Sequence, residues 1–129
     1  MLARYQIPPR FHKIPPGDPA LKGTRLDTRK NHNYVFCPTP EMVEAYFNDM
    51  TPKGWKLFTK NYRRLLQERF ETRREEFDKW ATVAAESDLF LGCSCPTERN
   101  PNLEQCHTWL ALEFMQKKYP KLKIEFPRS

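Results

Sequence analysis

The chain has 129 residues, a formal net charge of +6 and 13% aromatic residues. This length supports one domain with a hydrophobic core, and the apolar and aromatic content excludes a disordered chain. No apolar run approaches the roughly 20 residues of a membrane span, and the first residues lack the apolar segment of a signal peptide. We therefore expect a cytoplasmic protein, without membrane contact, whose thiols are reduced.

Residues 1–31 are predicted to form a proline-rich, basic, extended arm that packs on a body formed by residues 32–129. Five of the twelve prolines lie between residues 8 and 19, where fixed φ angles and missing amide donors disfavour helix and strand. Residues 1–32 carry seven lysines and arginines against two aspartates. Such an arm suits phosphate or a protein partner, although a solvated tail explains the charge equally well.

The next segments predict a strand and the starts of two helices. Residues 33–37 form a short strand candidate that ends at a proline. Thr39-Pro40 and Thr51-Pro52 each place an N-cap residue before a proline at the first helical position. The first helix is predicted to end near Met50. From residue 55 to residue 87 the apolar spacing predicts one long amphipathic helix, or two helices joined near residues 69–73.

The last third of the chain predicts a strand, a helix and a strand. Residues 89–93 form an apolar strand, residues 103–118 a helix with one apolar face, and residues 122–126 an alternating strand. Together these elements predict a small Rossmann-like three-layer α/β domain with a short, mainly parallel sheet. In such sheets ligands bind beyond the C-terminal ends of the strands.

Cys93 ends the predicted strand at residues 89–93 and Cys95 follows it, while Cys106 and His107 lie in the first turns of the helix predicted over residues 103–118. In one interpretation, Cys95 or Cys106 is a nucleophile and His107 a base or hydrogen-bond donor. In another, the cysteines are small core residues and the histidine is satisfied by a backbone carbonyl. Both alternatives stay open, and so does the question of whether the protein is an enzyme.

A zinc site built from the same four residues is a third, less favoured interpretation. Structural zinc sites usually pair ligands two to four residues apart, which Cys-x-Cys and an adjacent Cys-His do not match. Neighbours on a helix also point about 100° apart, so Cys106 and His107 are not expected to share one ion. We therefore predict no metal and no other cofactor.

Basic residues before the first predicted strand are candidates for phosphate binding: Arg25, Arg29 and Lys30. The leading hypothesis is a pocket for a nucleotide or a nucleic-acid element near the ends of strands 33–37 and 89–93, lined by Cys93, Cys95, Cys106 and His107. A transferase or hydrolase reaction there would use Cys95 or Cys106 with His107. The alternative is a non-enzymatic interaction or effector protein that docks through its basic arm and aromatic helices.

A strand that ends in Leu-Gly-Cys-Ser-Cys-Pro and a Cys-His pair that opens the last helix resemble the DUF488 and DUF4326 families. Residues 58–65 are also similar to a helix of the DUF488 branch. The resemblance spans roughly residues 25–126 and implies a compact Rossmann-like fold, a role with nucleotides or nucleic acid, and site residues at the two cysteine motifs. Two departures are a longer loop between the motifs, and Thr108 where DUF488 members often have arginine.

Overall fold

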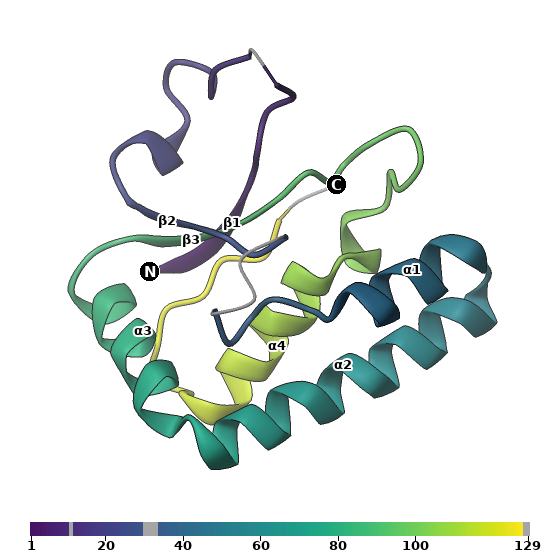
Figure 1. The fold of residues 1–129 in the computed structure, drawn as a ribbon. Coiled ribbons are helices and arrows are strands. Elements are labelled where there is room, and N and C mark those ends of the chain that lie inside the picture. Colours follow the sequence, from purple (N-terminus) through teal and green to yellow (C-terminus); the bar gives the residue numbers. More distant parts are fainter. Residues whose placement is uncertain (11, 30–33, 128–129) are drawn as a thin grey trace.

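The centre of the fold is a parallel three-stranded sheet (Figure 1). The computed structural model describes residues 1–10, 12–29 and 34–127. Strands β1 (Leu2–Gln6) and β2 (Thr24–Asp27) flank β3 (Leu89–Cys93) in the order β1-β3-β2. All five residues of β3 are buried, as expected for the central strand of a covered parallel sheet. The predicted small α/β fold with a parallel sheet is confirmed.

The described residues also form four α-helices: α1 (Pro40–Asn48), α2 (Pro52–Thr72), α3 (Arg74–Glu86) and α4 (His107–Lys118). Both predicted helix starts are confirmed, because the hydroxyls of Thr39 and Thr51 accept hydrogen bonds from backbone amides of the first helical turns. Of the two alternatives for residues 55–87, the structure has two helices, which meet at Arg73. None of the helices in the described part of the chain is long and apolar enough to cross a membrane.

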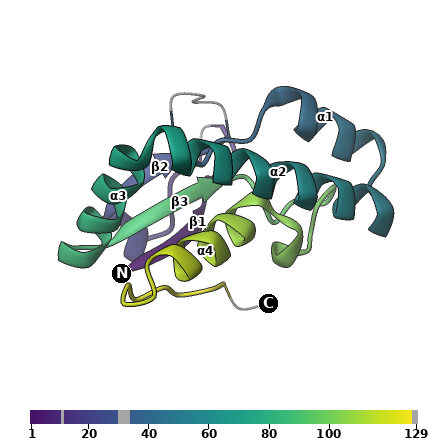
Figure 2. The same ribbon diagram turned by 90° about the horizontal axis from the view of Figure 1, so that it is seen from below.

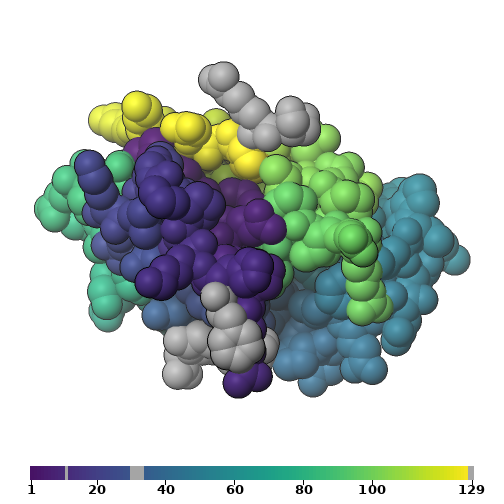
Figure 3. Space-filling view, turned by 90° about the horizontal axis from the view of Figure 1, so that it is seen from above, coloured from purple at the N-terminus to yellow at the C-terminus, as the bar shows by residue number. Residues whose placement is uncertain are grey.

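The two faces of the sheet are covered differently. Helices α2, α3 and α4 lie over one face (Figures 1 and 2), where Leu26 and Leu91 belong to the main core. The other face carries residues 7–10 and 12–23, which include a short 3-10 turn, η1 (Pro19–Leu21). There Phe90 packs against Ala20. Figure 3 looks onto this second face, and the dark blue atoms of this segment form much of its surface.

The predicted arm at residues 1–31 is wrong for two segments, because β1 and β2 are both strands of the sheet. Residues 2–6 pair in parallel with residues 89–93, and residues 24–27 pair with residues 89–92. The prolines between residues 8 and 19 lie in the connection between the two strands. A buried central strand needs a hydrogen-bonded neighbour on each side, and the N-terminal region supplies both.

The predicted strand at residues 33–37 is also wrong where the structure describes it, since residues 34–37 form a turn and an irregular segment. Its backbone carbonyls bond to side chains rather than to another strand. Arg69 Nη1 donates to Val35 O at 2.7 Å, and the Tyr62 hydroxyl donates to Phe36 O at 2.5 Å. Side chains of α2 therefore hold this segment in the core.

The predicted last strand at residues 122–126 is reduced to one bridge. Ile124 forms an isolated parallel bridge with Leu2, in which the Leu2 amide donates to Lys123 O and the Glu125 amide donates to Leu2 O. The chain end thus extends the outer edge of β1 over a very short stretch.

Candidate functional site

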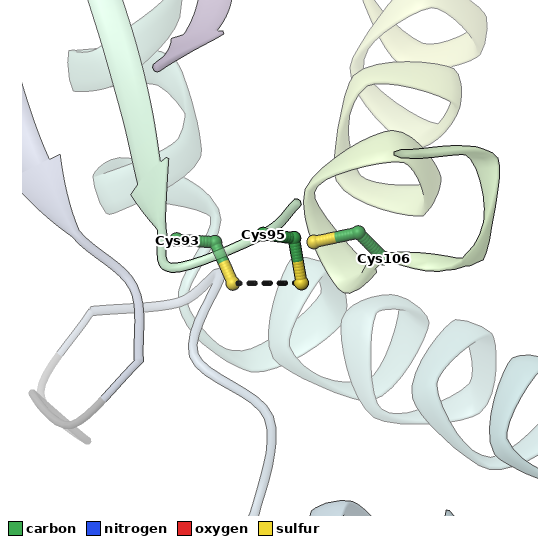
Figure 4. Close-up of side chains that lie close together, drawn as sticks. All are labelled: Cys93, Cys95 and Cys106. Atoms are coloured by element: carbon green, nitrogen blue, oxygen red, sulfur yellow. Dashed lines mark hydrogen bonds between the residues drawn. The ribbon is translucent and has the colours of Figure 1, made fainter. Parts of the chain in front are cut away.

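Three cysteine side chains meet at the C-terminal edge of the sheet (Figure 4). Cys93 is the last residue of β3, Cys95 lies two positions further on, and Cys106 immediately precedes α4. Their Sγ atoms all lie within 4.8 Å of one another, with 3.9 Å between those of Cys93 and Cys95. All three side chains are buried thiols. The fold therefore brings the two cysteine motifs of the sequence to one point.

The imidazole of His107 joins this cluster from the first turn of α4. Its Nδ1 lies 4.0 Å from Cys93 Sγ and 4.0 Å from Cys106 Sγ. Its Nε2 lies 2.7 Å from Thr28 Oγ1, which in turn is 2.8 Å from the carbonyl oxygen of Gly92. A carbonyl only accepts, so the Thr28 hydroxyl donates to Gly92 and accepts the hydrogen of Nε2. In the neutral imidazole, this network leaves the lone pair of Nδ1 facing the sulfur atoms, and in the protonated ring Nδ1 donates to them.

Two of the sulfur atoms accept hydrogen bonds from neighbouring side chains. Asn100 Nδ2 lies 3.2 Å from Cys95 Sγ, and Thr108 Oγ1 lies 3.1 Å from Cys106 Sγ. The Thr108 hydroxyl oxygen itself accepts from Arg4 Nε at 3.0 Å, so its hydrogen is directed to the sulfur. Donors aimed at a sulfur atom favour its thiolate form.

The three thiols hold their protons unequally. Hydrogen bonding with Cys93, and then with Cys95, lowers the pKa of Cys106, and the neighbouring His107 lowers it further. Hydrogen bonding with Cys106 raises the pKa of both Cys93 and Cys95. Hydrogen bonding within the cluster therefore favours a thiolate at Cys106.

A cavity of about 200 Å³ opens above these groups. We call the groups at its base, Cys93, Cys95, Cys106 and His107, the thiol floor. A second part of the lining, which we call the aromatic wall, consists of four rings from α1 and α2: Tyr46, Phe47, Trp55 and Phe58. The rings of the wall contact one another, with the centroids of Trp55 and Phe58 5.3 Å apart and nearly parallel. The cavity therefore combines flat apolar surface with reactive groups.

The basic residues predicted to contact phosphate do not all reach this cavity. Arg29 lines it, while its guanidinium pairs with Asp27 at 2.9 Å and donates to Ser94 Oγ at 2.8 Å. Arg25 lies in a different groove and is not part of the site. Lys30 lies outside the described residues. The site also lies beside the ends of β2 and β3 rather than between strands 33–37 and 89–93, because residues 34–37 are not a strand.

The helix-phase objection to a shared ion at Cys106 and His107 rests on a wrong premise. Cys106 precedes the helix, with an extended backbone at φ −130° and ψ 145°. Its side chain therefore does not follow the 100° step between helical neighbours. Both residues reach the same cluster.

Sequence reasoning missed several residues that support the site: Arg4, Thr28, Asn100 and Thr108. Thr28 follows β2, a strand that was not predicted from the sequence, so no signal in the sequence indicated its position at the site. Trp55 and Phe58 belong to the apolar spacing that predicts helix from residue 55 onward, and the rings of the aromatic wall do pack against the core. The apolar spacing of α2 gives no sign that some of these rings also line a cavity.

Comparison with known proteins places the chain in a family. No match was found among the curated proteins, and none among solved structures. A family model, DUF488-N3a, described as the active DUF488-N3 subclade, matches residues 27–119. This match covers well over half of the chain and contains both cysteine motifs, whereas a relationship to DUF4326 is not shown. The chain therefore belongs to the DUF488 family.

Proposed function

We propose that this protein is an enzyme that binds a nucleotide, or one nucleotide unit of a nucleic acid, with the base between the aromatic wall and the thiol floor. The observation that carries the proposal is that one cavity is lined both by stacked aromatic rings and by three thiols with an imidazole. The family model that matches the chain is described as an active subclade, which supports chemistry at this site.

A nucleobase suits the aromatic wall. Bases stack on aromatic side chains, and each stacked base contributes about 1–3 kcal/mol to binding. The cavity of about 200 Å³ has room for one flat ring system rather than for a large ligand. Thr97 and Gln105 also line the cavity and provide polar groups for the edge of a base.

A phosphate suits the groove next to the cavity. This groove shares Arg29 and Phe47 with the cavity and adds Arg99, whose guanidinium lies 4.4 Å from the centroid of the Phe47 ring. Arg29 is already paired with Asp27, and Glu44 lies in the same groove, so Arg99 is the main phosphate-binding candidate there. Arginine binds phosphate oxygens well because its planar fork matches their geometry.

The reaction we propose is transfer or hydrolysis of a group on the bound nucleotide, with Cys106 as the nucleophile. Its sulfur forms a bond to the transferred group, while the bond to the leaving group breaks with its electron pair. An acceptor or a water molecule then displaces the sulfur and regenerates the thiolate. Thr108 and the neighbouring thiols are placed to stabilise the negative charge on this sulfur.

Calorimetric titration with AMP, GMP, CMP and UMP tests the binding step. We expect at least one of them to bind, and Trp55→Ala to weaken that binding by about 5- to 150-fold, the equivalent of one lost stacking contact. Leu57→Ala is the matched control, because Leu57 is on the same helix and 55% exposed. Equal binding by the Trp55 variant and the control would overturn the base position.

Product analysis by mass spectrometry tests the reaction step. The protein is incubated with the nucleotide that binds best, as a monophosphate and within an oligonucleotide, with and without an acceptor amine. Cys106→Ser should abolish product formation, and Cys37→Ser should retain it because Cys37 does not line the cavity. Full turnover by the Cys106 variant would refute the assigned nucleophile.

A further inference from the structure

We propose that Cys93, Cys95, Cys106 and His107 bind one zinc ion through their three Sγ atoms and Nδ1. Three thiols and one imidazole nitrogen are a common donor set for this ion. The proposal does not rest on nucleotide binding. It concerns the same floor of the cavity but depends only on the positions of the donor atoms and of the groups around them.

The distances between the donor atoms are close to those of a loaded site. Zinc–sulfur bonds of about 2.3 Å in a tetrahedral site place two sulfur atoms about 3.8 Å apart, and a sulfur and a nitrogen about 3.5 Å apart. The structure has 3.9 Å between Cys93 and Cys95, 4.0 Å from Nδ1 to Cys93 and Cys106, and at most 4.8 Å between any two of the sulfurs. Binding of one ion would require side-chain rotations that bring the sulfurs closer together and turn Nδ1 of His107 toward them.

The groups behind the donor atoms are arranged as around a metal. A ligating histidine usually donates its other ring N–H to an oxygen, and His107 does so to Thr28. That hydroxyl is itself fixed by the Gly92 carbonyl. The bond therefore presents the lone pair of Nδ1, rather than a hydrogen, to the sulfurs. Asn100 and Thr108 donate to Cys95 and Cys106, as expected for groups that support thiolate ligands.

The charge of the loaded site is also matched. Three thiolates and a divalent ion leave a net charge of −1 in a buried cluster. Arg4 lies against this cluster from β1, with Nη2 2.7 Å from the carbonyl oxygen of Cys95 and Nε 3.0 Å from Thr108 Oγ1. Its positive charge offsets the residual negative charge, which reduces the cost of burying the site.

A bound ion is compatible with the proposed chemistry. A thiol that coordinates zinc is deprotonated outright. Cys106 also lines the cavity, so a zinc-bound thiolate at this position lies beside the proposed ligand. Loss of zinc binding would leave the nucleotide proposal standing, because the aromatic wall takes no part in coordination. Loss of nucleotide binding would likewise leave the metal site untouched.

The test is metal binding by the purified full-length protein under reducing conditions. We expect about one zinc per chain by elemental analysis, and an intense visible absorption when Co²⁺ replaces it, as tetrahedral thiolate sites give. Cys93→Ser, Cys95→Ser and Cys106→Ser should each lose or shift this absorption. Cys37→Ser is the matched control, since Cys37 is equally buried but lies outside the cluster.

Thr28→Val keeps the test decisive should the cysteine variants fail to fold, which circular dichroism detects. This change retains all four donor atoms and removes only the partner of Nε2. It should weaken zinc binding by about 10- to 100-fold in competition with a chelator. A folded, reduced wild-type protein that takes up no stoichiometric zinc overturns the proposal. So does an unchanged zinc affinity in Thr28→Val.

Discussion

The thiol floor and the aromatic wall line one cavity, but different forces hold them. In the floor, His107 bonds to Thr28, and the sulfurs of Cys95 and Cys106 accept from polar side chains. In the wall, Trp55 contacts both Phe58 and Tyr46, with ring centroids 5.3 Å away in both cases. Directional hydrogen bonds fix atoms, whereas ring contacts tolerate small shifts.

This difference separates the roles of the two regions. A floor fixed by hydrogen bonds keeps reacting or metal-binding atoms in register, which such chemistry requires. A wall fixed by packing adapts to the flat ring that enters. Changes behind the floor should therefore damage stability and metal binding together, and changes behind the wall should alter ligand affinity while the metal site persists.

The largest effect is expected from Arg4→Met, which removes the charged donor behind the floor. Cys95 O and Thr108 Oγ1 each lose a hydrogen bond from a guanidinium. We expect the free energy of unfolding to fall by about 2–3 kcal/mol in urea denaturation. Arg25→Met on β2 is the control, since Arg25 is exposed and should change stability by less than about 0.5 kcal/mol. If the free energy of unfolding fell equally in the two variants, Arg4 would not stabilise the thiol floor specifically.

The next largest effect is expected from Gly54→Ala, which acts on the wall alone. A Cβ at Gly54 would collide with the carbonyl oxygen of Asp49, where α1 ends against α2. We expect a loss of about 2 kcal/mol in unfolding free energy, since overpacking outweighs the gain in helix propensity. Nucleotide affinity should fall and zinc stoichiometry should stay the same. Loss of zinc in this variant would contradict the separation of the two regions.

A smaller effect is expected from Thr108→Val, which removes the hydroxyl between Arg4 and Cys106. The change leaves a donor and a sulfur without their partner and should cost about 1–2 kcal/mol. Thr59→Val is the matched control, because the Thr59 hydroxyl is buried without a hydrogen-bond partner. Its removal should be neutral or stabilising in thermal unfolding. The comparison fails if the two valine variants behave alike.

The smallest effect is expected from Tyr46→Phe, which removes a hydrogen bond between the aromatic wall and Gln105, the residue before Cys106 of the thiol floor. The Tyr46 hydroxyl donates to Gln105 Oε1 at 3.2 Å, close to the start of α4. We expect a loss of about 0.5–1 kcal/mol in unfolding free energy, with the ring contacts retained. A loss above about 2 kcal/mol would mean that the wall depends on hydrogen bonding as the floor does.

Local signals in the sequence predicted much of the helical layer. The Thr-Pro pairs at residues 39–40 and 51–52 define helix starts through their own side chains, so no distant contact is needed. The apolar run at residues 89–93 is likewise sufficient by itself to predict a buried strand. These elements were found because their cause lies within a few residues.

The two strands that were not predicted from the sequence, β1 and β2, depend on partners that are distant in the sequence. Residues 2–6 and 24–27 become strands because each pairs with β3, which lies between them. The prolines between residues 8 and 19 led instead to the prediction of an extended arm. Residues 34–37 carry strand-forming side chains, yet their backbone carbonyls accept hydrogen bonds from the side chains of Arg69 and Tyr62 rather than from another strand. The cysteine motifs were visible in the sequence, but their contact required the end of β3 and the extended backbone at Cys106. Long-range pairing of this kind leaves no local pattern.

The most direct test of one shared site is the rate at which iodoacetamide alkylates each cysteine, measured by peptide mass spectrometry. A nucleotide bound between wall and floor should slow alkylation of Cys95 and Cys106, which line the cavity. It should leave Cys37 unchanged, since Cys37 is buried elsewhere. Unchanged rates at Cys95 and Cys106 under saturating nucleotide, or equal protection of Cys37, would contradict a ligand site over the thiol floor.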